Sequence, residues 1–472
     1  MSLVLIPILL PLFTALLIHI LGRLASDNIR DGAHTLMAIV NFYFVCQIYP
    51  KVMSGEVVSA KVTDLFPGAP IYFEVEPLGM LFALVASGLW IPTSVYAFGY
   101  MRGHHEKNQT RFFTCFALAI GFAIGIAFSG NLITLFAFYE ALTFSTFPLV
   151  THHQDAAAKR SGRIYVGILV STSVCLLLTG IIAVWGLTGE MGFKQGGILA
   201  GKVDDAWTVG MLLALFAFGT GKAALFPFHK WLPNAMVAPT PVSALLHAVA
   251  VVKAGVFTVL KVIVYIFGYD LLTQMDVNGW LMAVACFTML FSSCVALTKD
   301  NLKARLAYST ISQLSYIVLG AAMANPIAWM GAALHIVMHA VGKITLFFCA
   351  GAIFVGAHKK YISQMDGLGH KMPWTMGAFT LASFSIIGLP PMGGVWSKWY
   401  LCLGALEAEH VIYLVAYMVS SLLSIGYLMP IVGRAYFRKP SKNDDSHVHE
   451  APWMCVLPLC ITAVGCVVLF FY

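Results

Sequence analysis

Ionisable side chains lie inside the long apolar segments of this 472-residue sequence. A lysine near the middle of a bilayer costs roughly 2.5 to 3.5 kcal/mol on insertion scales, so several of them call for an explanation. Glu140 is the one acid left in such a segment once the loop residues are set aside. A lysine paired with it would stay charged, whereas unpaired lysines would tend to neutralise. The pattern predicts an ionisable path through a membrane, and its lysines are Lys222, Lys253, Lys261, Lys343 and Lys398.

Histidines extend this set along a helix face. His335, His339 and Lys343 follow one another at intervals of four residues, so their side chains fall on one face of a helix. A further histidine, His247, lies six residues before the lysine of another apolar segment. Neutral imidazole accepts a proton at one nitrogen and donates one from the other, which suits a proton relay. For any one histidine taken alone, a satisfied core residue is the alternative.

Prolines interrupt two of the lysine-bearing segments. Pro227 and Pro233 follow the first of the five lysines, and Pro390 and Pro391 precede the last. Proline removes a backbone donor and clashes with the turn before it, so the freed carbonyls must be satisfied by side chains or water. Such breaks mark ion sites in transporters, although a structural kink is the alternative. Because there are two breaks and each lies beside a buried lysine, we interpret them as functional sites and not as structural kinks.

Apolar runs long enough to span a bilayer must position these groups. The sequence is 59% hydrophobic and 10% charged, with a mean hydropathy of +0.83, which indicates an all-α polytopic membrane protein. Fourteen such runs occur, at 2–22, 32–53, 78–100, 111–129, 131–150, 163–187, 207–227, 240–267, 279–298, 304–323, 328–356, 374–400, 411–433 and 452–472. The first lacks the charged start and the cleavage site of a signal peptide, so we expect it to be a membrane helix.

Basic residues alternate from loop to loop. Seven loops hold 19 of the 28 lysines and arginines, whereas the six intervening loops hold four of them and most of the loop acids. The positive-inside rule then predicts that the basic loops are cytoplasmic and that both termini face the other side. The net charge of +7 therefore needs no nucleic-acid partner, and no basic run or nucleic-acid-binding motif supports one.

The sequence carries no sign of a cofactor or a metal. Its ten cysteines are scattered singly, without the spacing of metal ligands. Nucleotide-binding glycine motifs, a haem-attachment motif and an iron–sulfur cysteine run are likewise missing. We expect no cofactor, no metal and no catalytic site in this chain, so any redox chemistry would take place elsewhere.

The placement of the sites suggests an inverted repeat. Segments four to eight contain the acid and a lysine beside a break, and segments nine to thirteen contain the histidine line and a lysine beside a break. An interval of five segments reverses orientation in the membrane. We expect a three-helix segment at 1–110, five-helix repeats at 111–270 and 271–435 with helices 7 and 12 broken, and a last helix at 436–472.

Several stretches resemble a known family: the antiporter-like membrane subunits of respiratory complex I, of Mrp-type multisubunit sodium/proton antiporters and of membrane-bound hydrogenases. They occur in the family's order over the middle two-thirds of the chain. They are FYEAL around Glu140, GKAALFPFHKWLPNAMVAPTPVSALLHAVAVVKAG from Gly221, KARLAYSTISQLSYIVLG from Lys303, HIVMHAVGKITLFFCAG from His335 and GLPPMGGVWSKWY from Gly388.

This resemblance implies a role for each position. Glu140 would be the fifth-helix glutamate that modulates its neighbour, and Lys222 the seventh-helix proton carrier. The eighth helix would contribute its connecting lysine, Lys253, with His247 beside it. The eleventh-helix relay would be His335, His339 and Lys343, and the twelfth-helix terminal group Lys398. Lysine at this last position argues against the branch similar to the complex I subunit next to the distal one, which has glutamate there. The long lateral helix of the distal subunit is not expected either.

We therefore expect a subunit that translocates protons or sodium within a multisubunit membrane complex, similar to the Mrp antiporter D-type subunit. Its partners would be other membrane subunits, and its location a bacterial or archaeal cytoplasmic membrane. One alternative is a proton-pumping subunit of a complex I-like quinone oxidoreductase or a membrane-bound hydrogenase. Another is an independent solute carrier, which should show a cluster of ligand-binding residues in place of a polar line.

Overall fold

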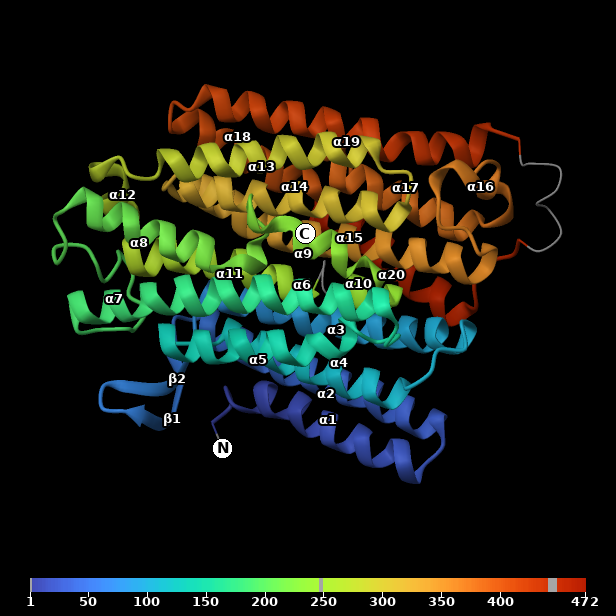
Figure 1. Ribbon diagram of the computed structural model, residues 1–472, viewed down its shortest axis with the longest axis horizontal. Helices are drawn as coiled ribbons and strands as arrows, with labels where there is room; N and C mark the ends of the chain where they lie inside the picture. Colours follow the sequence, from blue (N-terminus) through green and yellow to red (C-terminus); the bar gives the residue numbers. More distant parts are fainter. Residues whose placement is uncertain (1, 246–248, 440–447) are drawn as a thin grey trace.

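The computed structural model describes residues 2–245, 249–439 and 448–472. Its helices run roughly parallel to one long axis (Figure 1), as a bundle that crosses a bilayer requires. The first elements are α1 (Ile6–Leu24), α2 (Asp27–Met53), β1 (Val58–Phe66), β2 (Ala69–Val75), α3 (Pro77–Gly103) and α4 (Gln109–Ala127).

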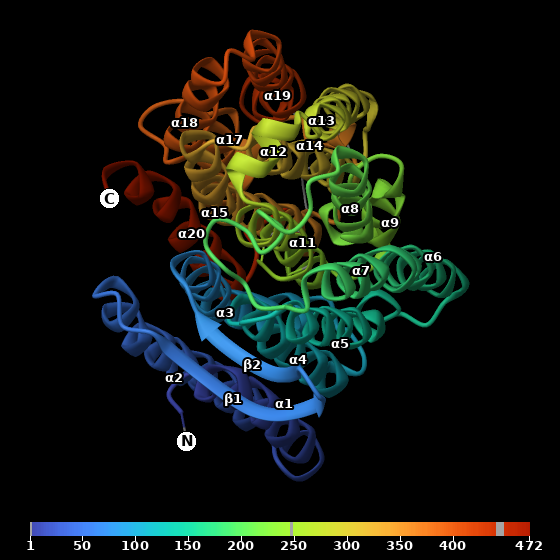
Figure 2. The ribbon, with the colours of Figure 1, turned by 90° about the vertical axis from the view of Figure 1, so that its left-hand side faces the viewer.

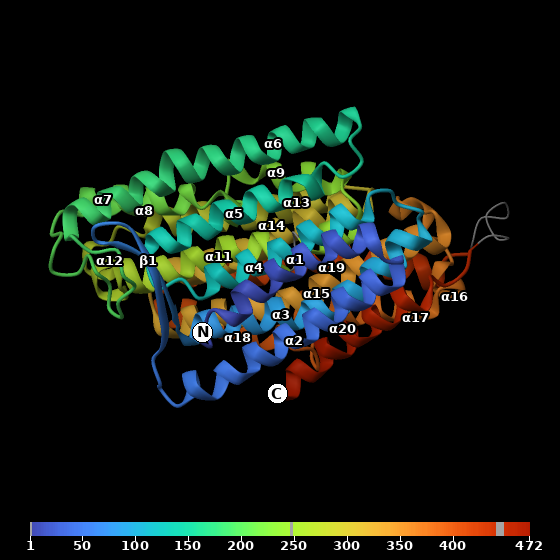
Figure 3. The same cartoon turned by 90° about the horizontal axis from the view of Figure 1, so that it is seen from below.

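The middle of the chain alternates long helices with broken ones. Helices α6 and α7 join through a π-helical turn at Ser173–Leu177 and form one long edge of the molecule (Figure 3). The elements are α5 (Leu132–Val150), α6 (Ala156–Thr172), α7 (Leu178–Thr188), α8 (Ala206–Gly219), α9 (Trp231–Asn234), α10 (Thr240–Ala244), α11 (Val251–Val262) and α12 (Tyr269–Met275).

The last third of the chain is helical, with one wide break. The elements are α13 (Gly279–Thr298), α14 (Leu302–Ala322), α15 (Pro326–Ala357), α16 (Leu368–Lys371), α17 (Pro373–Ile387), α18 (Gly394–Glu407), α19 (Val411–Phe437) and α20 (Trp453–Phe471).

Within the described residues, ten helices are long and apolar enough to cross a membrane, or eleven if the bent α11–α12 pair is one span. The other segments expected to span coincide with α8, α10–α11, α14 and α17–α18. Three of these four are short or interrupted. The fourth, α14, carries buried hydroxyl and amide side chains such as those of Ser309 and Gln313. The protein is thus an integral, multi-pass membrane protein, and its interrupted segments carry Lys222, Lys253 and Lys398.

A β-hairpin between α2 and α3 was not expected. Strands β1 and β2 pair in antiparallel register from Val58 opposite Val75 to Phe66 opposite Ala69. Gly68 closes the turn with φ +87°, a conformation that favours glycine. A Pro-Gly turn between two runs rich in β-branched and aromatic residues is the signal that would have predicted it.

The loops gather at two ends of the bundle. The hairpin end holds residues 58–75, whose Phe73 bridges to Ser129. The basic end holds the loops at 104–108, 299–301 and 358–372, where Asn301 bridges to Tyr361. Figure 1 shows the hairpin and α16 at opposite ends of the long axis. Three of the seven loops that the charge pattern assigned to one side therefore lie at one end.

Helices α11 and α15 occupy the middle of the bundle in the end-on view of Figure 2. In α15, 83% of the most apolar stretch is buried inside the protein, against 33% in the outer helices α1, α19 and α20. Helices α15 and α18 approach closely, because an added Cβ at Gly404 would lie 2.4 Å from the backbone nitrogen of Ala328. Polar groups on α11 and α15 are thus shielded from lipid.

Candidate functional site

Lys222 lies in the first break. Helix α8 ends at Gly219, and Lys222 occupies the single 3-10 turn that follows, Gly221–Ala223. Its ammonium is fully buried and donates to the backbone oxygen of Tyr139 at 2.9 Å and to Thr143 Oγ1 at 2.6 Å. The same nitrogen lies 3.2 Å from the centre of the Tyr139 ring. One turn of α5 therefore holds this lysine by two acceptors and a π face.

Glu140 is adjacent to this turn but does not bond to the lysine. Within the described residues Lys222 has no ion pair with it, and neither Glu140 oxygen has a hydrogen-bond partner. The direct pair expected from the sequence is therefore not formed, although the two groups attract each other through space. The reason is helix geometry: consecutive residues of α5 point about 100° apart, so Glu140 turns away when Tyr139 faces Lys222. Half-buried Glu140 shares the side of the exposed Phe144.

Lys253 and His339 meet between the two central helices. Lys253 Nζ on α11 lies 2.6 Å from His339 Nδ1 on α15, and both residues are buried. Eighty-six positions separate them in the sequence, so no spacing rule could have paired them. His247, the other histidine expected on this path, lies outside the described residues.

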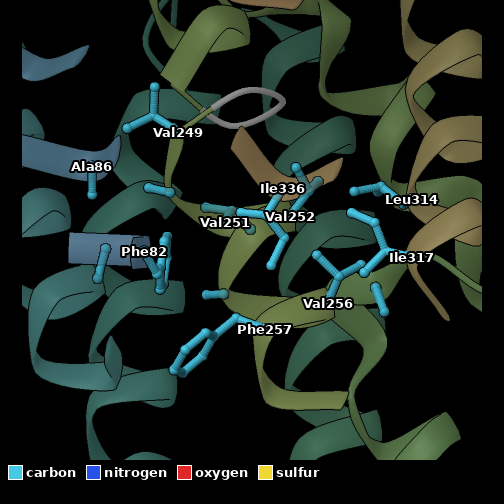
Figure 4. Close-up of a cluster of buried hydrophobic side chains, with 14 of the residues drawn as sticks. Phe82, Ala86, Val249, Val251, Val252, Val256, Phe257, Leu314, Ile317 and Ile336 are labelled. Carbon is cyan, nitrogen blue, oxygen red and sulfur yellow. The ribbon is translucent and has the colours of Figure 1, made fainter. Parts of the chain in front are cut away.

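Apolar side chains enclose this contact. Figure 4 shows Val251, Val252, Val256 and Phe257 of α11 with side chains of α3, α14 and α15 around them, including Ile336. A low-dielectric surrounding strengthens a hydrogen bond between lysine and imidazole and makes an unpaired charge there costly. The lysine–histidine contact therefore lies in an apolar part of the bundle, with the His335 ring as a stacked neighbour of His339.

His335 continues the line toward the second break. Its Nδ1 lies 2.9 Å from Ser397 Oγ and its Nε2 lies 3.1 Å from Gln313 Oε1. Its ring stacks on that of His339 with centroids 5.9 Å apart, and on Tyr316 at 5.4 Å. Both ring nitrogens are thus occupied by groups that can exchange a proton or orient the ring.

Lys343 lies on α15 one turn after His339, as the spacing predicted, but its side chain contacts α14. Its Nζ donates to Ser309 Oγ at 2.6 Å and to the Leu306 oxygen at 3.3 Å. Ser309 in turn donates to Tyr427 OH at 2.9 Å, and Ser424 lies 2.9 Å from the same oxygen. A chain of hydroxyl groups therefore leads from Lys343 to α19.

Lys398 lies in α18, just after the second break. Its Nζ donates to the Ile387 oxygen at 2.9 Å and to Ser421 Oγ at 2.9 Å. Ile387 is the last residue of α17, so the lysine satisfies a carbonyl that the break leaves free. Pro390 and Pro391 form the turn between α17 and α18, as expected. The first break begins where α8 ends, at Gly219, which is before either proline. Pro227 lies outside the helices, and Pro233 lies inside the short α9.

Lys261 belongs to a separate site at the hairpin end. Its Nζ lies 2.7 Å from Glu76 Oε1 and 2.6 Å from the Ser129 oxygen, and 4.4 Å from the centre of the Phe193 ring. Glu76 directly precedes α3, and its side chain is 14% exposed. Burial raises the pKa of the Glu76 carboxyl, and the neighbouring Lys261 ammonium opposes this rise. The structure provides no contact between this pair and the other lysines within the described residues.

Three acids with largely buried side chains, Glu76, Glu106 and Asp31, were missed because all were assigned to loops. Asp31 lies within α2, since that helix begins at Asp27 rather than at residue 32. Asp31 pairs with Arg30 at 2.8 Å and also with Arg102. Glu140 is therefore not the one carboxylate inside the protein, and Arg30 is not a loop residue.

Gly255 lets α11 pack against the broken segment. An added Cβ there would lie 2.4 Å from the carbonyl carbon of Lys222 and from the nitrogen of Ala223. These are backbone atoms, which cannot rotate away, so a glycine is required at this crossing. The position of Lys222 thus depends on a residue without a side chain on α11.

We expect Gly255→Ala to lower the stability of the protein, because overpacking of this kind typically costs about 1–3 kcal/mol. Thermal unfolding of the purified chain in detergent micelles would measure the loss. Gly167→Ala is the control, because an added Cβ at Gly167 has no neighbour within 4 Å outside its own helix. Equal midpoints for the two variants would contradict the proposed close packing.

Comparisons with known proteins agree on one family. The family model described as NADH:quinone oxidoreductase/Mrp antiporter, transmembrane, matches residues 129–424. The chain is 31% identical to NADH-quinone oxidoreductase subunit N of Desulforudis audaxviator, over 98% of this chain and 94% of that protein. It is also 31% identical to mnhA2, a putative antiporter subunit of Staphylococcus haemolyticus, over 91% of this chain, but spans only 56% of that longer protein.

Two solved structures share the fold. A chain of the membrane-bound sulfane sulfur reductase, an archaeal respiratory membrane complex, superposes with a TM-score of 0.88 at 22% identity, covering 99% of this chain and 94% of that one. A chain of the Mrp complex from Dietzia sp. gives 0.87 at 21% identity, covering 100% and 95%. The lysines and histidines of the central line all fall within the matched family range, whereas Glu76 and Asp31 precede it.

Proposed function

Because the chain belongs to the NADH:quinone oxidoreductase/Mrp antiporter transmembrane family, we propose that it is a proton-translocating subunit of a multisubunit membrane complex. The observation that carries the proposal is the 2.6 Å contact of Lys253 with His339, which joins the lysine-bearing half of the path to the histidine-bearing half. Proton transfer needs such hydrogen-bond reach between heavy atoms. The proton is the transported ion, and sodium is the exchange partner to be tested beside it.

The proposed path follows the buried contacts. Lys222 loads a proton and passes it through water to Lys253, from which it reaches His339 and then the stacked ring of His335. Beyond His335 the proton moves by Ser397 toward Lys398, with Lys343 as a side branch into the hydroxyl chain. Each lysine has neutral acceptors within 3 Å, so it can be charged or neutral without leaving a partner ion unpaired.

Glu140 is proposed to respond to a neighbouring subunit. Its carboxylate oxygens are buried and have no hydrogen-bond partner within the described residues, and Phe144, one turn along the same face of α5, is exposed. A positive charge brought to this face by another membrane subunit would weaken the attraction of Glu140 for the Lys222 ammonium. The loaded lysine would then lose its proton to the path more readily. The partners are therefore other membrane subunits of the same complex.

The finer topology is also a proposal. Fourteen membrane crossings, with both termini on the non-cytoplasmic side of a bacterial or archaeal cytoplasmic membrane, agree with the basic loops at one end. Inverted five-helix repeats at 111–270 and 271–435 are supported by two broken elements, α8 with its continuation and α17 with α18, which each place a lysine beside the break. The segments 1–110 and 436–472 would flank these repeats.

Two parent complexes fit this function. The resemblance at Lys398 favours an Mrp-type cation/proton antiporter, the first candidate. A proton-pumping place in a quinone oxidoreductase or another respiratory complex is the second, because subunit N of an NADH-quinone oxidoreductase matches the chain over 94% of its own length. In both cases the chain itself would contribute no cofactor and no redox step. The proteins that co-purify with it decide between them.

The test is ion flux in liposomes that contain the complex purified through this chain. We expect Lys253→Met to reduce proton movement at least roughly tenfold, since it removes the group that links the two halves of the path. Lys51→Met, a change at an exposed lysine in an outer pair with Glu56, is the matched control. Wild-type flux in the Lys253 variant would refute the proposed path, and sodium movement would be followed in the same vesicles.

A further inference from the structure

A carboxylate at the basic end is surrounded by histidines. Glu106, in the loop between α3 and α4, lies 3.0 Å from His104 Nδ1, 3.6 Å from His153 Nδ1 and 3.9 Å from His152 Nε2. The Glu106 side chain is only 8% exposed. We call these four residues the Glu106 cluster; none of them belongs to the path described above.

Packing fixes the cluster in place. Arg111 at the start of α4 donates to the backbone oxygen of His152 at 2.9 Å, and Gln109 donates to the backbone oxygen of Glu106 at 3.1 Å. The loop after α3 and the loop after α5 are thereby tied together. Burial lowers the pKa of His152 to about 4, so this imidazole is neutral at physiological pH. The cluster is therefore a built feature and not an accidental surface contact.

Two hollows meet at the Glu106 cluster. An outer hollow of about 320 Å³ is lined by all four members of the cluster together with the loop residues around them. An inner cavity of about 400 Å³ is lined by His104, Glu106 and His153 on one wall and reaches Thr240 and Ala350. Both are large enough for several water molecules, and their walls offer polar partners. The cluster thus lies on the wall of both hollows, and the inner one also has exposed residues, Val237 and Tyr361, in its lining.

The inner cavity points toward the central path along two helices. On α15, Ala350 follows Lys343 by seven residues, so the two lie on one face about 10 Å apart along the axis. On α10, Ser243 lies one turn beyond Thr240, fully buried, and its hydroxyl has no hydrogen-bond partner among the described residues. A buried hydroxyl is normally satisfied, so this one calls for water beyond the cavity floor.

Lysine side chains also line the inner cavity and affect how a proton would move through it. Across from Glu106 the wall carries Lys303, Lys359 and Lys360. Lys303 Nζ donates to the Ala238 oxygen at 2.6 Å, and Lys360 lies over the Phe354 ring at 4.7 Å. Ammonium groups repel a further positive charge, so they oppose both the entry and the retention of a proton in the cavity, and the Glu106 carboxylate is the acidic group of the lining that attracts one. Within the described residues no group of His, Cys, Asp and Glu is arranged to hold a metal, so the ligand in view is the proton.

We propose that the Glu106 cluster and its two hollows form a proton-collecting site that supplies the central path from the basic end. Histidine and glutamate side chains at the mouth take protons from water and pass them to water in the inner cavity. From there the direction along Thr240 and Ser243 leads to the Lys253–His339 contact. This inference rests on the proposed function, because a collecting site has meaning only if the central path carries protons.

The test uses the intact complex in liposomes, with proton uptake measured from the side that the basic end faces, over a range of pH on that side. We expect Glu106→Gln to slow uptake roughly tenfold at alkaline pH and little at acidic pH, where protons are abundant. His153→Gln, at a more exposed position, should show the same trend if Glu106→Gln assembles poorly. Added imidazole buffer should restore uptake, since a mobile proton carrier replaces a lost collector but does not repair a structural defect.

His370→Asn is the matched control, because His370 is an exposed histidine at the same end that lines neither hollow. A wild-type pH profile in both Glu106→Gln and His153→Gln overturns the collecting site. A uniform loss that imidazole does not restore also overturns it and indicates a structural role. If proton flux persists when Lys222 is replaced by alanine, it is the proposed function that fails; if that variant is inactive and the cluster variants are normal, only the collecting site is wrong.

Discussion

Lys222→Ala should abolish proton translocation by the complex while the chain remains inserted and assembled. The ammonium of Lys222 is the only charged group in the turn Gly221–Ala223, and its two acceptors, the Tyr139 oxygen and the Thr143 hydroxyl, are neutral. Removal of the lysine breaks no direct ion pair, although Glu140 loses the positive charge that attracts it through space. It does remove the group from which a proton enters the path. Proton flux in liposomes and co-purification of partner subunits measure the two effects separately.

The control for this variant lies in the same broken segment. Lys230→Ala changes an exposed lysine eight residues further along the chain, and we expect transport close to that of the wild type. Loss of transport in both variants would indicate that the segment tolerates no change, so the effect could not be assigned to Lys222. Normal transport by Lys222→Ala would show that the lysine is structural and would refute the proposed path.

Much of the central path follows from local rules. The line of His335, His339 and Lys343 could be predicted because an interval of four residues in an apolar run needs only helix geometry. The second break could be predicted because Pro390 and Pro391 act on the backbone where they stand, whereas the first begins before Pro227 and Pro233. Lys222 and Lys398 were expected beside those breaks, and the structure places them there.

Contacts between helices could not be predicted in this way. The approach of Lys253 to His339 depends on how α11 packs against α15, and nothing in either segment specifies the partner. The direct pair of Lys222 with Glu140 was expected from charge alone, but the rotation of α5 presents Tyr139 and Thr143 instead. Charge counting finds which groups need partners, and packing decides which partners they get.

The unexpected hairpin also explains why Glu76 was not counted among the buried acids. Glu76 was assigned to a loop, and loops are normally solvated, so its charge was set aside. In the structure β2 leads directly into α3 and brings this carboxylate against Lys261 at the end of α11. One buried lysine that seemed to lack a partner therefore has one. Its contacts join the hairpin end to the central helix, and the proposed path does not pass through it.

Glu76→Gln should destabilise the protein by about 3–5 kcal/mol, since loss of one partner leaves the other buried without its counter-charge. The Lys261 side chain is 1% exposed and that of Glu76 is 14% exposed, so water screens this pair little. The control is Glu56→Gln in the surface pair with Lys51, whose side chains are 54% and 44% exposed; there we expect a loss below about 1 kcal/mol. Unfolding by denaturant in detergent micelles compares the two.

A double variant separates the ion pair from the packing around it. Replacement of both partners, Glu76→Leu together with Lys261→Leu, leaves no buried charge, so it should recover most of the stability that Glu76→Gln loses. Recovery would show that the cost of the single change is the uncompensated lysine. If the double variant is as unstable as Glu76→Gln, the pair's hydrogen bonds to the surrounding backbone, such as that from Lys261 to the Ser129 oxygen, hold the hairpin end together instead.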